Sequence, residues 1–195
     1  MTRKEYEGYL TAHLKPKRYK HCLGVEQCAM ELARLWGADA EKASLAGLLH
    51  DCAKWMKGET LIEYLRTHGY PLDDWDMSSQ QTLHAPAGAY LARETLGVQD
   101  EEVLHAIACH AVPGENMGLL DIIISLSDFI EPYRKEIPGL DEIRSLARTD
   151  LREAYHRYLG QMMGHLLQED ILVHPRTLLS YNQYFLDKLA ERPSG

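Results

Sequence analysis

Residues 119–132 read LLDIIISLSDFIEP, and the structure that this stretch adopts decides the fold class. Its run of isoleucines is compatible with a buried strand, because β-branched residues are enriched in sheets. However, Asp121, Ser125 and Asp128 recur at four- and three-residue intervals, as on one face of a helix. No other stretch has the pattern of a strand that could pair with this one. We therefore predict a helix here and an all-α fold.

Helix start and stop signals recur on both sides of this stretch. Pro16 and Gly37 stand at the start and the end of one segment, and Asp39 and Asp100 can cap two others. The pattern predicts helices at residues 16–36, 40–56, 59–68, 86–96, 101–110, 119–131, 140–172 and 175–192. Residues 70–82, YPLDDWDMSSQQT, have the composition of a loop. We therefore predict one all-α domain over residues 1–195.

The composition limits the classes of function. Hydrophobic residues make up 45% of the 195 residues and charged residues 26%, as in an ordinary globular protein. The formal net charge of −8 argues against a nucleic-acid partner bound by a broad basic surface. No apolar stretch reaches the about 20 residues of a membrane span, and the N-terminus lacks the apolar region of a secretory signal. The four cysteines form no CxxC pair, so we expect free thiols, a cytoplasmic protein and no membrane partner.

Asp128 is the least expected residue of the apolar stretch. A buried, ionised carboxylate is costly unless it is paired, hydrogen-bonded or bound to a metal ion. A salt bridge between helices is one explanation, and a metal site is the other. Imidazoles and a second carboxylate stand in or beside the other predicted helices. The candidate metal ligands are His21, His50, Asp51, His84, His110 and Asp128.

These six side chains come from five helices or helix junctions, as in metal sites built in the core of helical bundles. They offer imidazole and carboxylate donors without thiolates, which favours iron, manganese or another first-row ion over a structural zinc site. Such a set could hold two ions about 3.5–4 Å apart, with Asp51 as the bridge. Taken singly, each histidine is also compatible with a hydrogen-bonded structural role.

Basic side chains near these candidates point to a phosphate substrate. Arg18 precedes the first candidate histidine by nearly one helical turn, and Lys54 follows Asp51 by the same interval. Arg134 lies just beyond the apolar stretch. Their cationic groups could bind phosphate oxygens, although each is also compatible with a solvated surface position.

Glu131 could orient a metal ligand or face water. The remaining histidines are interpreted as solvated or structural residues: His13, His68, His105, His156, His165 and His174.

The order His21, His50–Asp51, Asp128 resembles that of the HD-domain metal-dependent phosphohydrolases. Further strings make the chain similar, over nearly its whole length, to the YqeK family of symmetrical bis(5′-nucleosyl)-tetraphosphatases. These strings are RYKHCLGV, LLHDCAK, LHAPAGAYLA, LLDIIISLSDFIEPYR, PGLDEIRSLARTDL and HPRTLLSYN. The resemblance implies an HD core at about residues 16–133 with a metal centre inside it, and C-terminal helices at about residues 139–191.

The resemblance also implies two metal ions, of which iron is favoured, and the hydrolysis of diadenosine tetraphosphate into two ADP. It implies that Arg18, Lys54 and Arg134 bind the phosphates of this small dinucleotide. It further suggests a homodimer. By the same carry-over, one ion is bound by His21, His50, Asp51 and Asp128, and the other by His84, His110 and the bridging Asp51.

The expected chemistry is in-line attack by a hydroxide bridging the two ions on one of the two central phosphorus atoms. Asp51 and Lys54 would have catalytic roles, and Lys54 or Arg18 would stabilise the developing charge. The chain departs from the family after His110: the family often continues this histidine as His-Thr-Thr-Gly, whereas here AVPGEN follows it, so hydroxyl donors are missing there.

Three other readings remain open from the residues alone. The chain could be another HD-type phosphohydrolase, such as a nucleotidase or a guanosine alarmone hydrolase. It could be an HD module that binds a nucleotide without turning it over. Finally, it could be an all-α scaffold with scattered histidines.

Overall fold

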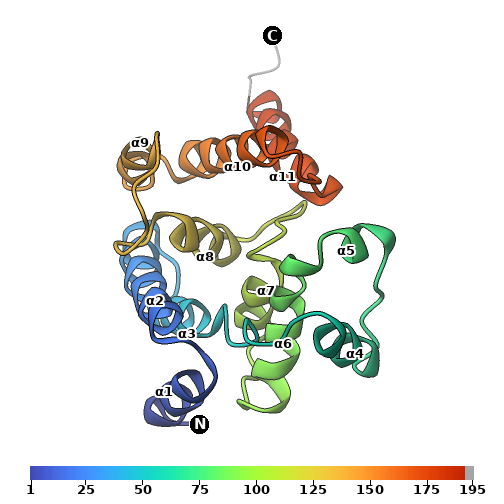
Figure 1. Ribbon diagram of the computed structural model, residues 1–195. Coiled ribbons are helices and arrows are strands. Elements are labelled where there is room, and N and C mark those ends of the chain that lie inside the picture. The colour runs from blue at the N-terminus through green and yellow to red at the C-terminus, as the bar shows by residue number, and fades with distance from the viewer. Residues whose placement is uncertain (192–195) are drawn as a thin grey trace.

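The computed structural model describes residues 1–191, which form helices and connecting segments without a strand (Figure 1). The all-α prediction is therefore confirmed. The elements are α1 (Arg3–His13), α2 (Pro16–Trp36), α3 (Ala40–Leu49), α4 (Glu59–Thr67), α5 (Asp74–Ser78), the 3₁₀ turn η1 (Gln80–Thr82), α6 (His84–Glu94), α7 (Glu101–Cys109), α8 (Leu119–Ile130), α9 (Leu140–Leu146), α10 (Leu151–Gln168) and α11 (Pro175–Ala190). Within the described residues, no helix combines the length and the apolar character that crossing a membrane requires.

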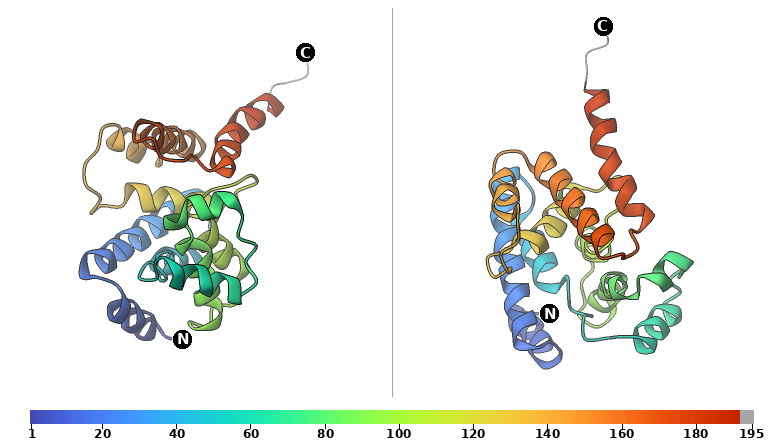
Figure 2. Two further views of the ribbon diagram at one scale, coloured as in Figure 1. Left: turned by 45° about the vertical axis from the view of Figure 1, so that its right-hand side comes forward. Right: turned by 45° about the horizontal axis from the view of Figure 1, so that its top comes forward.

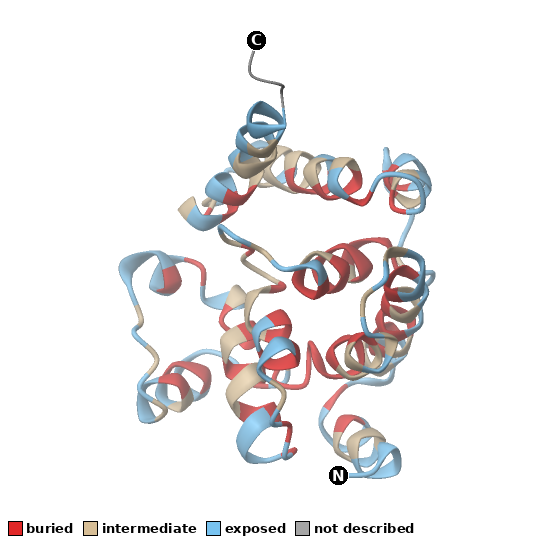
Figure 3. Ribbon diagram, turned by 180° about the vertical axis from the view of Figure 1, so that it is seen from behind, coloured by how far each residue is buried: buried red, intermediate tan, exposed pale blue. Residues whose placement is uncertain are grey.

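Helix α8, the stretch that decides the fold class, lies in the middle of the molecule. Nine of its twelve residues are buried, which is expected of a helix that is apolar on nearly all sides. It packs against α2, α3 and α7 on one side and against α9 and α10 on the other. Seen from behind, the buried faces of these helices point toward one another (Figure 3). Asp128 lies on this helix, but 28% of its side chain is exposed because it borders a cavity, so it is less buried than the sequence suggested.

Helices α2 and α3 pack with their backbones in close contact. A Cβ atom added to Gly47 would lie 2.9 Å from the Cα atom of Glu26, which is shorter than real carbon contacts. Only glycine therefore allows the two backbones to pack at this distance. Glu26 is itself buried, and its carboxylate accepts hydrogen bonds from Arg3 and from the Ser44 hydroxyl. This contact fixes how the first half of the site is assembled.

Helices α10 and α11 form a separate layer above α8 (Figure 1). Helix α10 contacts both α8 and α9, whereas α11 packs on α10 and extends away from the other helices (Figure 2). Much of α11 is exposed, including five large apolar side chains: Leu178, Leu179, Phe185, Leu186 and Leu189. The layer covers one face of the core that carries the candidate ligands.

Several helix boundaries differ from the predicted ones because capping signals were not recognised. Residues 1–15 contain α1, where Glu5 accepts a hydrogen bond from the Thr2 amide at 2.6 Å. The predicted loop 70–82 contains α5 and η1, and reciprocal bonds between Asp73 and Asp76 begin α5. The predicted helix 140–172 is two helices, α9 and α10, since the Asp150 side chain caps the second at the Glu153 amide.

Two further boundaries affect the site directly. The predicted helix 40–56 ends at Leu49, and residues 50–55 form turns instead. Helix α6 begins at His84, two residues before the proline that was expected to open it, because proline fits anywhere in the first turn. The predicted end of the last helix, Arg192, lies outside the described residues.

The close contact at Gly47 yields a test of the fold. Replacing Gly47 with alanine should lower the free energy of unfolding by about 1–3 kcal/mol, because the added methyl group pushes α2 away from α3. For a chain of this length, the melting temperature should fall by about 2–4 °C for each kcal/mol. The control is Gly8→Ala in α1, where a Cβ meets nothing within 4 Å and should not destabilise the protein. Equal melting temperatures for the two variants would contradict the packing argument.

Candidate metal centre

The Asp51 carboxylate lies between two groups of imidazoles. Its Oδ2 atom lies 3.4 Å from the Nε2 atom of His50 and 3.9 Å from that of His21. Its Oδ1 atom lies 3.1 Å from the Nε2 atom of His84 and 3.9 Å from that of His110. The carboxylate is buried, with 2% of its side chain exposed. Each oxygen of one side chain thus faces a separate pair of nitrogen donors.

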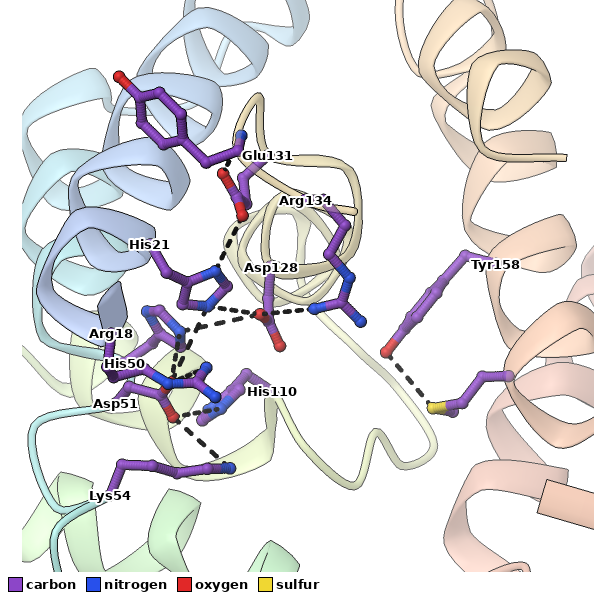
Figure 4. A network of polar contacts seen from close by, with 12 residues as sticks. Arg18, His21, His50, Asp51, Lys54, His110, Asp128, Glu131, Arg134 and Tyr158 are labelled. Carbon is purple, nitrogen blue, oxygen red and sulfur yellow. Dashed lines mark hydrogen bonds and ion pairs between the residues drawn. The ribbon is translucent and has the colours of Figure 1, made fainter. Parts of the chain in front are cut away.

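Asp128 completes the first of these groups from the last turns of α8. Its Oδ1 atom lies 3.0 Å from the Nε2 atom of His21 and 3.9 Å from that of His50 (Figure 4). The structure thereby brings all six predicted ligands into one cluster. They come from α2, the turn after α3, the start of α6, the end of α7, and α8.

The orientation of every imidazole in the cluster is fixed through its other nitrogen. The Nδ1 atoms of His50, His84 and His110 lie 2.7, 2.6 and 2.8 Å from the carbonyl oxygens of residues 47, 81 and 107. A carbonyl oxygen only accepts hydrogen bonds, so each of these Nδ1 atoms carries the proton. The corresponding Nε2 atoms therefore present lone pairs to the centre of the cluster.

The Glu131 carboxylate fixes the orientation of the His21 ring in the same way, through its Nδ1 atom. Its Oε1 atom lies 3.1 Å from the Nδ1 atom of His21, while its Oε2 atom accepts a hydrogen bond from the Tyr133 amide at 2.5 Å. Glu131 is 2% exposed, which excludes the alternative that it faces water. A carboxylate behind a ligating imidazole fixes the ring and makes it a stronger donor.

The cluster concentrates electron-rich atoms that have no hydrogen-bond partner. The Nε2 atoms of His21 and His50 and the Oδ1 atom of Asp51 are buried without a hydrogen bond. The Nε2 atoms of His84 and His110 approach to 3.2 Å, although both carry lone pairs. Such groups are stable together only when a cation lies among them. The residues present therefore fit a metal centre, and no thiolate belongs to this set.

The charges of the cluster agree with this conclusion. Burial raises the pKa of the Asp51 carboxyl, but the neighbouring His50 and His84 outweigh it and hold that pKa well below its usual value. Burial, together with His50 and His84, lowers the pKa of His110 to about 3. At neutral pH the carboxylate is therefore ionised and His110 is neutral, which are the protonation states of metal ligands.

Two of the predicted phosphate-binding cations contact the same carboxylate. The Arg18 Nη1 atom lies 2.7 Å from Asp51 Oδ2, and the Lys54 Nζ atom lies 3.8 Å from Asp51 Oδ1. Lys54 also lies 2.9 Å from the Nε2 atom of His84. Burial lowers the pKa of Lys54. Both cations therefore lie at the edge of the cluster, on opposite oxygens of Asp51.

The third predicted cation lies on the Asp128 side of the cluster. The Arg134 Nη1 atom is 4.0 Å from Asp128 Oδ1, and its guanidinium carbon lies 5.5 Å from the centre of the Phe129 ring. Figure 4 shows Arg134 between Asp128 and the side chain of Tyr158 on α10. This position leaves the guanidinium facing the space between the two layers of the fold.

A cavity of about 1280 Å³ opens from the cluster into that space. It exceeds the usual volume of a site for a small ligand, which is about 300–1,000 Å³. Besides the three predicted cations, Lys57 and Lys135 line it, and neither forms an ion pair with any described residue. Sequence reasoning missed these two lysines, since only the fold shows that both line the cavity that opens from the cluster.

The remaining histidines lie outside the cluster. His13, His105 and His165 are exposed, His68 and His156 are partly buried, and His174 is buried. His156 is stacked between the rings of Tyr181 and Tyr184, at centroid distances of 4.3 and 4.1 Å. His165 lines the cavity from α10. Helical spacing within α10 could not show either contact, because both depend on how α10 packs on other elements.

Comparison with known proteins places these features in a family. A model described as HD domain matches residues 18–133. A protein of Halalkalibacterium halodurans named bis(5′-nucleosyl)-tetraphosphatase, symmetrical, is 40% identical, with 90% of this chain and 93% of that protein covered. A Bacillus subtilis protein of the same name is 38% identical, with 93% and 97% covered.

A solved structure gives the same result at the level of the fold. The crystal structure of an HD superfamily hydrolase from Clostridium acetobutylicum, described as involved in NAD metabolism, superposes with a TM-score of 0.93. The two chains are 38% identical, and the match covers 96% of this chain and 98% of the other.

The contact between Glu131 and His21 can be tested through metal affinity. Replacing Glu131 with glutamine should weaken metal binding by about 10–100-fold, since the amide cannot accept from both the His21 ring and the Tyr133 amide. The measurement is a titration of metal-stripped protein with Mn²⁺ against a competing chelator. Glu136→Gln, an exposed neighbour paired with Arg144, is the matched control and should bind as the unmodified chain does. Unchanged affinity in the Glu131 variant would refute this role.

Proposed function

This chain belongs to the HD-domain family, within the group of symmetrical bis(5′-nucleosyl)-tetraphosphatases, and on that premise we propose that it hydrolyses diadenosine tetraphosphate into two ADP. The observation that carries the proposal is one cavity that combines metal-ligand donors with cations in a chain of net charge −8. Such a cavity is suited to a small polyanion that is cleaved at a phosphoryl group. The measured identities to proteins of this activity support the choice of substrate.

We assign the two halves of the cluster to two metal ions. One ion would be held by His21, His50, Asp51 and Asp128, and the other by His84, His110 and Asp51. Asp51 is the bridge in this assignment because its two oxygens face the two groups separately. Iron is the proposed metal, with manganese as the nearest alternative, since the donors are imidazoles and carboxylates only. When bound, such ions supply Lewis acidity that activates water and neutralises charge on phosphoryl oxygens.

The residues of this chain would orient the substrate and compensate its charge. Arg18 and Lys54 lie on opposite oxygens of Asp51, so both can reach a phosphate held above that carboxylate. Lys54 is close enough to stabilise charge that develops on the phosphoryl oxygens. Arg134 would bind the phosphates on the Asp128 side, and Lys57 and Lys135, which line the same cavity, would add to its positive charge.

A symmetrical cut constrains the binding geometry further. The reacting phosphorus must be one of the two central atoms, so an ADP unit extends from the metal centre in each direction. Lys54 lies beside His84 in one half of the cluster, and Arg134 lies beside Asp128 in the other. This arrangement meets the requirement, because each ADP unit carries its own phosphate charge. If cations lay on one side of the cluster only, we would expect the dinucleotide to be cleaved near one of its ends instead.

The organisation of the whole chain is proposed on similar grounds. We treat residues 1–195 as one domain, in which the HD core at about 16–133 is covered by the helices at about 139–191, since α10 contacts α8 directly.

The exposed apolar side chains of α11 are suited to contact with a second copy, consistent with a homodimer. Four free cysteines agree with a cytoplasmic location, which we also propose.

The other activities considered above differ in their substrates or in turnover. A nucleotidase or a hydrolase of guanosine alarmones would use the same metal centre. A panel of these substrates, with diadenosine tetraphosphate included, separates them by relative kcat/KM. An HD module that only binds nucleotide would show no turnover with any of them.

Product analysis provides the main test of the activity. Metal-loaded protein should convert diadenosine tetraphosphate into ADP alone, as resolved by anion-exchange chromatography, whereas ATP together with AMP would refute a symmetrical cut. Asp51→Ala should lose about 10³-fold or more in kcat, because one side chain serves both halves of the cluster. Its sequence neighbour provides the control: Cys52→Ala removes a buried thiol bonded to the Gly88 carbonyl and should keep its activity.

Metal content tests the assignment of the two ions independently of turnover. Protein purified from cells supplied with iron should contain about two iron ions per chain by elemental analysis, one for each half of the cluster. His84→Ala should retain about one, since the ligands of the other half remain. Equal metal content in both proteins would contradict the division of the cluster into two sites.

A further inference from the structure

A second group of side chains that can ligate a metal lies outside the cluster, between α7 and α8. His105 and Cys109 stand four residues apart on one face of α7, and Asp121 lies in the first turn of α8. One ligand atom from each of the three side chains lies within 4.8 Å of the other two. None of them belongs to the six candidate ligands of the cluster, and the proposed function does not use them.

The three side chains meet at one nitrogen of the His105 ring. Its Nδ1 atom lies 2.9 Å from Asp121 Oδ1 and 3.9 Å from Cys109 Sγ. In a catalytic relay of thiol, imidazole and carboxylate, the thiol and the carboxylate contact opposite nitrogens of the ring. Here both face the same nitrogen, so the imidazole cannot pass a proton from one to the other. The arrangement is that of three donors around a common point.

The separations of these donors are close to those around a tetrahedral ion. Zinc bonds of about 2.0–2.3 Å at tetrahedral angles place nitrogen, oxygen and sulfur ligands about 3.3–3.6 Å apart. The two measured distances from Nδ1, 2.9 and 3.9 Å, lie on either side of this range. Small side-chain rotations therefore suffice to bring all three donors to a zinc ion.

The Asp121 carboxylate is held in position by its own helix. Its Oδ2 atom accepts a hydrogen bond from the Gly118 amide at 2.8 Å, and only 6% of the side chain is exposed. Its Oδ1 atom faces His105. The Cys109 thiol, in contrast, makes no short hydrogen bond, since its sulfur lies 3.8 Å from the Ala106 carbonyl oxygen. A cation would stabilise a buried carboxylate and a thiol in this arrangement.

An ion can reach this group from solution. The His105 side chain is 61% exposed, and its Nε2 atom bonds to no other residue in the range 1–191. When an ion binds, it replaces the proton of the thiol, which passes to water, and the neutral ring carries its own proton on Nε2. Water fills the fourth position, as in zinc sites with three protein ligands.

We propose that His105, Cys109 and Asp121 form a separate binding site for a single zinc ion. The sulfur ligand distinguishes this site from the cluster, whose donors are imidazoles and carboxylates, because thiolates favour Zn²⁺ over Mn²⁺. The bound ion joins the end of α7 to the start of α8. It thereby fixes both ends of the segment 110–118, whose first two residues line the cavity. The proposal does not depend on the proposed activity.

Cobalt is a probe that separates this site from the cluster. Co²⁺ bound by a thiolate gives a sulfur-to-metal charge-transfer band in the near ultraviolet, whereas Co²⁺ bound by imidazoles and carboxylates gives none. Metal-stripped, reduced protein should therefore develop this band when it is titrated with excess Co²⁺, and Cys109→Ser should abolish it. Cys28→Ser is the matched control and should keep the band, because it removes another partly buried cysteine that belongs to no group of ligands.

Zinc content provides a second measurement. In equilibrium dialysis against Zn²⁺, the unmodified protein should bind about one ion more per chain than Cys109→Ser or His105→Ala. His105 is exposed, so its replacement by alanine removes a ligand without disturbing the core. Equal zinc content in the three proteins would overturn the site. So would a cobalt band that is absent from the unmodified protein, that persists in Cys109→Ser or that is lost in Cys28→Ser.

Discussion

The contact between α2 and α3 at Gly47 is the constraint on which the rest of the site depends. Helix α2 carries His21, and the end of α3 leads directly into His50 and Asp51, so the distance between these helices sets the distance between the donors. Backbone meets backbone there, with Glu26 Cα 2.9 Å from the place where a side chain would begin. The Gly47 carbonyl also accepts the hydrogen bond from His50 that fixes the ring. One residue thus determines both the separation of the helices and the direction of a ligand.

Imidazoles that lie next to helix ends are likewise fixed by a hydrogen bond to the backbone. His50, His84 and His110 each bond to the carbonyl three residues earlier in the chain. The last carbonyls of a helix have no intrahelical partner, so a histidine that follows α3 or α7 satisfies one of them. Its second nitrogen is then directed away from the helix and toward the core. Helix termination and ligand orientation are therefore one interaction at His50 and His110. His21, in contrast, lies within α2 and is oriented by the Glu131 carboxylate.

Much of this arrangement could be predicted from the sequence, because the signals are local. The helix at 119–130 follows from the spacing of Asp121, Ser125 and Asp128, and a carboxylate in so apolar a helix indicates a site. The short helices α1 and α5 have local signals too, in Thr2–Glu5 and Asp73–Asp76, which composition alone concealed. The contributions of Lys57, Lys135 and α10 could not be found in this way, because they depend on how the C-terminal layer packs over α8. Glu131 is intermediate: its position after Asp128 suggested two roles, and only its burial beside His21 decides between them.

The distribution of charge over the molecule determines which anions it can bind. A chain with net charge −8 repels extended polyanions, yet five cationic side chains and two carboxylates line one cavity. Attraction is therefore confined to ligands small enough to enter it. Inside, Arg18 contacts the Asp51 carboxylate at 2.7 Å and Arg134 approaches that of Asp128 to 4.0 Å. Lys57 and Lys135 form no ion pair with a described residue and are available to bind phosphates. Charge alone cannot distinguish one polyphosphate from another, so discrimination must come from uncharged groups in the cavity wall. Side chains of α10 contribute to that wall together with those of α4 and η1. The C-terminal layer therefore shapes the site, although none of the six candidate metal ligands comes from it.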